Sequence, residues 1–246
     1  MSHFFPFRQI GDFQITALSD GTMSASLDLL SGIEKADADV IQNDAGLDEP
    51  ADIHINCYLI RGRGRVILVD AGAGPLSNKG GQLNVNLAAV GISPDEVDTV
   101  LLTHCHPDHI GGLLDPEKRP VFQRAQIMLH PLEAQHWLDD KKLSMANERG
   151  QRNFGLVRQT LHAYARNLRF FDGDNIAEGI LPVWLPGHTP GHTGFRIDAD
   201  DKCLLIWGDI VHYPHIQSAH PNVSILFDTD PAQACLLYTS PSPRDA

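Results

Sequence analysis

Short hydrophobic runs separated by turn residues recur along the chain and predict a protein rich in strands. Apolar and polar residues alternate over 53–59, and the turn Arg61-Gly62-Arg63-Gly64 leads into the apolar run 66–69. Strict alternation is typical of a half-buried strand, so this segment predicts a β-hairpin. Further strands are expected at 100–102, 127–129, 181–185, 195–197 and 203–207.

Apolar residues at helical spacing predict helices between these strands. One helix is expected to end at Gly91, and a second should present the apolar residues of 154–168 on one face. The segment Ser93-Pro94-Asp95-Glu96 is a capping box with proline at the first helical position, which predicts another helix start. A last helix should begin at Pro231. Strands followed by helices in each half favour a layered α/β sandwich over an alternating barrel.

The composition predicts a single domain with a buried core, because 42% of the 246 residues are hydrophobic. The net charge of -12 opposes binding to nucleic acid, since no stripe of Lys or Arg is present to neutralise phosphates. No segment reads as a signal peptide or reaches the length of a membrane span, so a cytoplasmic protein without a membrane partner is expected; a processed secreted protein would look the same. The four cysteines are scattered and indicate neither a disulfide framework nor a thiolate metal site.

The segment after the expected strand 100–102 concentrates metal-binding side chains. Three histidines and one aspartate fall within six positions: His104, His106, Asp108 and His109. Such a density is costly in a folded core unless the side chains are paired or bound to metal. His188 and Asp209 each follow a later apolar strand in the same way. Together these residues predict a hydrolytic site for two metal ions.

The spacing of these residues predicts how they divide between two cations. His104 and His106 can turn both rings toward one cation, whereas Asp108 and His109 can face a second one. His188 would complete the first set, and the two oxygens of Asp209 could bridge both ions. Shared coordination lowers the pKa of a trapped water, so hydroxide is the expected nucleophile.

Three motifs taken together resemble the metallo-β-lactamase-fold hydrolase superfamily. They are His-x-His-x-Asp-His at 104–109, Pro-Gly-His-Thr-Pro-Gly-His at 186–192, and Gly208-Asp209. The Asp-Ala-Gly run at 70–72 resembles an early motif of that superfamily, and segments 11–21, 69–74 and 207–212 resemble its methyl parathion hydrolase-like branch. The resemblance implies a four-layer αββα sandwich. It also implies hydrolysis of small uncharged esters, lactones or phosphotriesters.

The resemblance implies specific roles for the site residues. The first metal takes His104, His106 and His188, the second takes Asp108 and His109, and Asp209 bridges them. Zinc is expected in both positions, with manganese, cobalt or iron as alternatives, because ligand type alone does not select the metal. Asp70 would organise the metal-binding loop without touching metal.

Catalytic roles are expected for Asp108 and Asp209, which would fix the hydroxide and accept its proton. His212 could polarise the substrate oxygen, or it could only pack in the loop. His192 is expected to form hydrogen bonds behind the ligands. Cys105, between two ligands, should point away from the metals.

The resemblance also predicts an incomplete C-terminal end. Relatives supply a final histidine to the second metal after the bridging aspartate, and no histidine follows His220 here. We expect a hydrolase domain over 1–235 that lacks its final C-terminal elements, followed by a non-native tail over 236–246. His215 could replace the missing ligand, although only its nearness in the sequence supports this.

Other functions compete with hydrolysis by two metals. A persulfide dioxygenase with a single iron uses a related motif, and a truncated inactive fragment would bind metal weakly. A nuclease of the same fold is opposed by the acidic charge. The apolar cluster over 4–7 could form a homodimer contact, or it could pack across the sheet.

Overall fold

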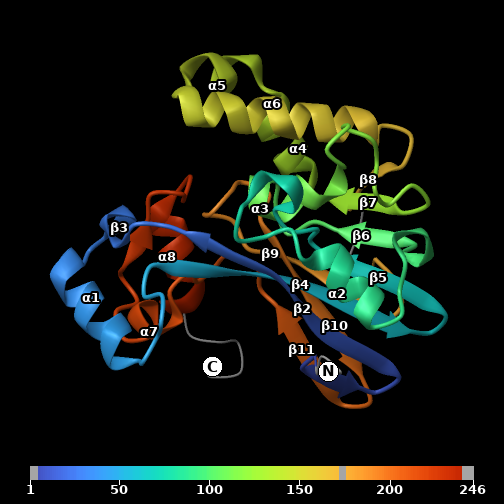
Figure 1. The fold of residues 1–246 in the computed structure, drawn as a ribbon, viewed down its shortest axis with the longest axis horizontal. Helices are drawn as coiled ribbons and strands as arrows, with labels where there is room; N and C mark the ends of the chain where they lie inside the picture. Colours follow the sequence, from blue (N-terminus) through green and yellow to red (C-terminus); the bar gives the residue numbers. More distant parts are fainter. Residues whose placement is uncertain (1–4, 172–175, 240–246) are drawn as a thin grey trace.

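The computed structural model describes residues 5–171 and 176–239, and its framework is a seven-stranded mixed sheet (Figure 1). The strand order is β1-β2-β4-β5-β6-β7-β8; the pairs from β1 to β5 are antiparallel, and the pairs from β5 to β8 are parallel. The strands are β1 (Phe7–Ile10), β2 (Phe13–Ser24), β4 (Asp52–Gly62), β5 (Arg65–Val69), β6 (Thr99–Leu101), β7 (Gln126–Leu129) and β8 (Leu168–Phe170). Phe4 of the apolar cluster and residues 240–246 of the expected tail lie outside the described residues.

A second, three-stranded sheet packs on one face of the first. Its antiparallel order is β11 (Lys202–Ile206), β10 (Thr193–Ala199) and β9 (Ile180–Trp184). Phe195, Ile197 and Ile206 point inward and join Ile67 and Leu101 of the larger sheet in one buried cluster. A short pair, β3 (Leu30–Ser31) with β12 (Ser224–Ile225), forms a third sheet at the side.

Helices cover the opposite face of the large sheet and also gather at one side of the molecule (Figure 1). The helices are α1 (Lys35–Asp44), α2 (Leu83–Ala89), α3 (Pro107–Ile110), α4 (Pro131–Leu138), α5 (Asp140–Met145), α6 (Glu148–Ala163), α7 (Pro214–Gln217) and α8 (Pro231–Thr239). Single 3-10 turns lie at Leu27–Leu29, Gly74–Leu76, Pro94–Glu96 and Gly111–Leu113. None of the helices in the described part of the chain has both the length and the hydrophobicity needed to span a bilayer.

The observed elements confirm the mixed α/β sandwich and the predicted hairpin, and they correct two details. The capping box at Ser93 forms as expected, yet it opens only the 3-10 turn Pro94–Glu96, so the helix predicted there is wrong. The chain must turn at once because Thr99 pairs with Ile67 in the parallel sheet. The helix predicted through residue 168 ends at Ala163, since Leu168 begins β8 and pairs with Ile127.

One end of this sandwich collects the loops that carry the predicted site. Strand β5 ends at Val69 and β6 ends at Leu101, so Asp70 and the histidine loop leave neighbouring parallel strands at the same edge. Ends of parallel strands meet at one edge of a sheet, where α/β folds place their chemistry. Loops 185–192 and 207–212 follow β9 and β11 of the second sheet.

Asp98 links β5 to the start of β6. We expect Asp98→Asn to lower the free energy of unfolding by about 1 kcal/mol at pH 7, a value that allows for the partial exposure of the side chain. Its carboxylate accepts bonds from the Arg65 guanidinium and from the Val66 amide. Although partial burial raises the pKa of Asp98, its bond with Arg65 lowers it below the usual value of 3.8 overall.

The stabilisation by Asp98 is therefore complete above pH 3.8 and is lost as the pH falls through the lower folded-state pKa. Urea unfolding should be measured at pH 7 and at acid pH. The difference in free energy of unfolding between wild type and Asp98→Asn should become smaller at acid pH. The exposed Asp95→Asn, in the neighbouring turn, serves as the control. An equal difference at all pH values would contradict a role for the charge.

Candidate metal centre

Three histidine rings meet at one point between the two sheets. His106 Nδ1 lies 3.0 Å from His104 Nε2 and 2.9 Å from His188 Nε2. His104 and His188 are almost fully buried, and burial lowers their pKa values well below the usual range. Burial also lowers the pKa of His106 to about 4. Neutral rings keep the lone pairs that a metal ion needs, so this set has the chemistry of a cation site.

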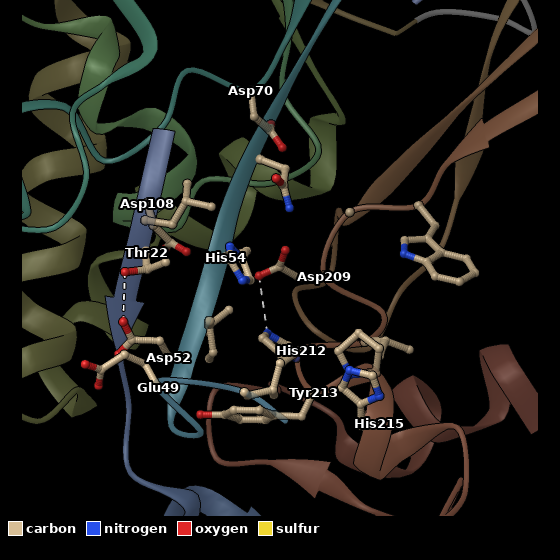
Figure 2. Close-up of a pocket in the computed structure, with 18 of the residues that line it drawn as sticks. Thr22, Glu49, Asp52, His54, Asp70, Asp108, Asp209, His212, Tyr213 and His215 are labelled. Atoms are coloured by element: carbon tan, nitrogen blue, oxygen red, sulfur yellow. Dashed lines mark hydrogen bonds and ion pairs between the residues drawn. The ribbon is translucent and has the colours of Figure 1, made fainter. Parts of the chain in front are cut away.

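A second group forms around one oxygen of Asp209. Its Oδ2 lies 3.3 Å from His109 Nε2, 3.6 Å from His188 Nε2 and 3.2 Å from His212 Nε2. His109 Nε2 also lies 3.4 Å from Asp108 Oδ2. One carboxylate oxygen therefore contacts a ring of the first group and two rings outside it. This is the arrangement that a bridging ligand requires, and Figure 2 shows Asp209 and His212 pointing toward each other in the cavity.

The electrostatics of this second group also fit a cation. Burial opposes a charge on His109, yet Asp209, Asp70 and Asp108 raise its pKa well above the usual value. Burial likewise opposes charge on Asp209, while His109 and His212 hold its pKa well below the usual range. The carboxylates thus create a strongly negative potential around His109 Nε2, which favours a bound cation. Among the described residues, Asp209 joins His104 and His109 in one cluster that could hold a cation, and His188 and His212 in another.

Asp70 holds the histidine loop by hydrogen bonds, as expected from the sequence. Its carboxylate accepts bonds of 2.8 Å from the Thr103 amide, the Thr103 hydroxyl and His109 Nδ1. This last bond fixes the tautomer of His109 and leaves Nε2 facing Asp209. Asp70 has a left-handed φ of 59°, and Gly72 has a φ of 70°. Glycine is needed at position 72 because a Cβ there would lie 2.3 Å from Cγ of the buried Asp20.

His192 and Asp228 orient the ligands from behind. His192 Nε2 accepts a bond of 3.0 Å from the Asp209 amide, and its Nδ1 lies 2.9 Å from the Leu185 carbonyl. A Cβ at Gly208 would lie 2.5 Å from His192 Nε2, so glycine is required for this approach. Asp228 Oδ1 lies 2.8 Å from His188 Nδ1, which turns His188 Nε2 toward the other rings. His192 matches its expected role, whereas Asp228 carried no sequence signal beyond an ordinary loop aspartate.

Glu133 is a buried carboxylate that ties the two histidine loops together. Its Oε1 accepts bonds from the Cys105 amide at 3.0 Å and from Trp137 Nε1 at 2.8 Å. Its Oε2 accepts bonds from the Thr189 hydroxyl at 2.7 Å and the Gly191 amide at 3.1 Å. Sequence reasoning missed this residue because a glutamate in the first turn of a helix is typical of an exposed surface.

His215, His212 and Cys105 differ in their position relative to the metal-binding groups. His215 is exposed on α7, and within the described residues it belongs to none of the clusters that could hold an ion. His212 does belong to one, together with His188 and Asp209. Cys105 is fully buried in the core under the helices, in agreement with a packing role.

Two cavities border the cluster from different sides. The larger, of about 720 Å³, contains Asp108, Asp209 and His212 in its wall (Figure 2). His109 and Tyr58 also line it. The smaller, of about 440 Å³, also reaches Asp108, Asp209 and His212, and it continues over Trp137 and Phe227. A small molecule in either cavity can therefore touch the same polar centre.

Comparison with known proteins identifies the family and the fold. A family model described as "Metallo-beta-lactamase superfamily" matches residues 51–238. The crystal structure of hydrolase AbOPH in the beta lactamase superfamily is 31% identical, with a TM-score of 0.85 over 94% of this chain and 82% of that chain. AidC, a dizinc quorum-quenching lactonase solved with a product, N-hexanoyl-L-homoserine, is 27% identical, with a TM-score of 0.86 over 94% of this chain and 83% of that chain.

The curated relatives are longer than the region that this chain matches. The uncharacterized protein YobT of Bacillus subtilis (strain 168) is 29% identical over 63% of this chain and 62% of its own length. The probable metallo-hydrolase Rv2300c of Mycobacterium tuberculosis (strain ATCC 25618 / H37Rv) is 28% identical over 50% of this chain and 40% of its own length. The chain thus matches less than two thirds of either relative.

Proposed function

This chain belongs to the metallo-beta-lactamase superfamily, and we propose that it is a metal-dependent hydrolase of small molecules with an uncharged ester, lactone or phosphotriester bond. The observation that carries the proposal is the position of Asp209 Oδ2, within 3.2–3.6 Å of three histidine rings. Two relatives support the reaction class: AbOPH is described as a hydrolase and AidC as a dizinc lactonase.

The residues divide into two sets on either side of Asp209. The first ion would be held by the three converging rings and Asp209, and the second by Asp108, His109 and Asp209. Divalent ions bound there supply an acidified water and polarise the carbonyl or phosphoryl oxygen of the substrate. Zinc is the metal we propose for both sets, because neutral imidazoles and carboxylates in a compact cluster suit it well.

The protein contributes orientation and proton handling. Asp70 and Asp228 each accept a bond from a ring nitrogen and so aim the opposite nitrogen of that ring into the site. Asp108 and Asp209 border both cavities, where they can accept a proton during attack on the substrate.

His212 is proposed to donate a hydrogen bond to the negative charge that develops on the substrate oxygen. His212 is buried, its Nε2 lies 3.2 Å from Asp209 Oδ2, and the residue belongs to the wall of both cavities. We expect His212→Ala to lower kcat by about 100-fold with little change in metal content, as for loss of one oxyanion donor. Activity assays with metal analysis would check this. Loss of a metal ion instead would identify His212 as a ligand.

A substrate panel tests the proposed function. Aryl esters, lactones and organophosphate triesters should be assayed with zinc-loaded protein, alongside Asp209→Asn as the inactive control. Hydrolysis of at least one class, abolished by the substitution, is the expected result. Turnover by oxygen uptake on a persulfide, with no hydrolysis, would overturn the proposal.

A further inference from the structure

The two cavities that border the cluster differ in charge. Beyond the cluster, the larger cavity is lined by the carboxylates Asp48, Glu49 and Asp52. In the smaller cavity the described lining residues include no carboxylate other than Asp108 and Asp209. A substrate group with a negative charge is therefore disfavoured in the larger cavity and meets less repulsion in the smaller one.

One arginine side chain is found in the described lining of these cavities. Among their described lining residues, Arg149 is the only lysine or arginine, and it belongs to the smaller cavity. In a chain with a net charge of -12, this places a local positive charge beside the site. Arg149 lies in the first turn of α6, so its backbone is fixed by a helix of 16 residues.

The guanidinium of Arg149 is held in a position that leaves its donors available. Its Cζ lies 4.6 Å from the centre of the Phe227 ring. The Phe227 ring in turn lies 6.2 Å from the ring of His212, which contacts Asp209. Arg149 is exposed, and a guanidinium over an aromatic ring can still donate its N–H groups to a planar, bidentate acceptor.

Six of the eleven other arginines of the described chain lie within ion-pair distance of a carboxylate. Arg65 bonds Asp98, Arg158 bonds Asp140, and Arg63 bonds Asp12. Arg152, one turn from Arg149, lies 3.9 Å from Glu148. Within the described residues, Arg149 has no carboxylate within ion-pair distance. Its donors are thus available to a ligand in the cavity.

We propose that Arg149 is a specificity residue that binds a carboxylate carried by the substrate away from the bond that is hydrolysed. The inference rests on the proposed function and narrows it. The walls of the smaller cavity include Trp137, Phe154 and Leu226, so an apolar segment would connect the reacting bond to that carboxylate. This proposal departs from the entirely uncharged substrate expected from the sequence, which stays a prediction: here the reacting bond is neutral, and the substrate has one remote anion.

Matched esters test this inference with the zinc-loaded protein. In the first pair, para-carboxyphenyl butyrate carries the carboxylate on its leaving group, and para-carbamoylphenyl butyrate is its neutral analogue. In the second pair, monophenyl glutarate carries the carboxylate on its acyl group, and the phenyl ester of glutaramic acid is its neutral analogue. For at least one pair, Arg149→Gln should lower kcat/KM for the anion about tenfold, mainly through KM. The neutral analogues should change less than about twofold, as expected without a bond to charge.

Arg152→Gln is the matched control, because Arg152 lies on the same helix and outside both cavities. Arg152→Gln should leave the ratio of kcat/KM for the anionic ester to kcat/KM for its neutral analogue unchanged. Arg149→Lys should restore part of the preference for the anionic ester, because lysine keeps the positive charge but lacks the planar guanidinium. Equal anion-to-neutral ratios in wild type and Arg149→Gln for both pairs would overturn the inference while leaving the proposed function intact.

A binding measurement separates failure of the inference from failure of the proposed function. Calorimetric titration with benzoate and with benzamide requires no turnover. If none of the esters is hydrolysed, the proposed function fails in its ester form, and benzoate then decides the role of Arg149. About tenfold weaker benzoate binding in Arg149→Gln, with unchanged benzamide binding, supports the anion site. Equal benzoate affinity in wild type and Arg149→Gln would overturn it.

Discussion

Replacement of His106 by alanine should lower hydrolysis by roughly 100-fold or more, because even the loss of a group that only orients a metal ligand costs about 10–100-fold. His106 Nδ1 lies between His104 Nε2 and His188 Nε2, at 3.0 and 2.9 Å. Its removal takes one of three neutral nitrogens from the first set and leaves the other two without a common partner. Metal analysis and activity assays on the purified variant would measure both effects.

The control for this substitution is His162→Ala, at an exposed position on α6. It removes an imidazole of equal size and should leave metal content and rate unchanged. Native metal content together with a native rate in His106→Ala would show that the converging rings do not bind the ion.

Replacement of Glu133 by alanine should destabilise the fold by about 3 kcal/mol or more and reduce metal affinity at the same time. Glu133 is fully buried, and its two oxygens accept four hydrogen bonds from the two histidine loops and from Trp137. Without it, buried amides of both loops lose their acceptors, and the loop with His106 is no longer tied to the loop with His188. Urea unfolding and zinc titration would report the two losses.

Glu117→Ala is the matched control, because the Glu117 side chain is 64% exposed and pairs only with Arg119. Its effect on stability should be small. Glu133→Gln adds a second comparison. The glutamine side chain keeps the shape of glutamate, but its NH₂ group faces N–H or O–H donors of the protein and cannot accept their hydrogen bonds. If Glu133→Ala unfolded at the urea concentration of wild type and bound zinc equally well, Glu133 would have no role in joining the loops.

The sequence predicted the parts of this protein that depend on local pattern. The alternation over 53–59 and the apolar run 66–69 became β4 and β5, because each needs only a neighbouring strand to bury its apolar face. The histidine loop was predictable because unpaired imidazoles and carboxylates at this density have few other uses in a folded chain. Asp70 was predictable only through the family resemblance.

Other features depend on contacts between distant segments, which local pattern does not contain. Glu133 joins residues 28 and 58 positions away, and Asp228 meets His188 across 40 positions. Leu168 continued the apolar spacing of α6, yet the parallel pairing with β7 placed it in a strand. The capping box at 93–96 formed, but a single turn was all the chain could use before β6.

Removal and stepwise return of metal tests the central claim most directly. The purified protein should be stripped with a chelator, and zinc should then be added in steps while bound zinc and the rate of hydrolysis are measured together. We predict no hydrolysis by the stripped protein, and a rate that rises with bound zinc in wild type and not in His106→Ala. A stripped protein that retains the full rate would contradict a metal-dependent mechanism at this cluster.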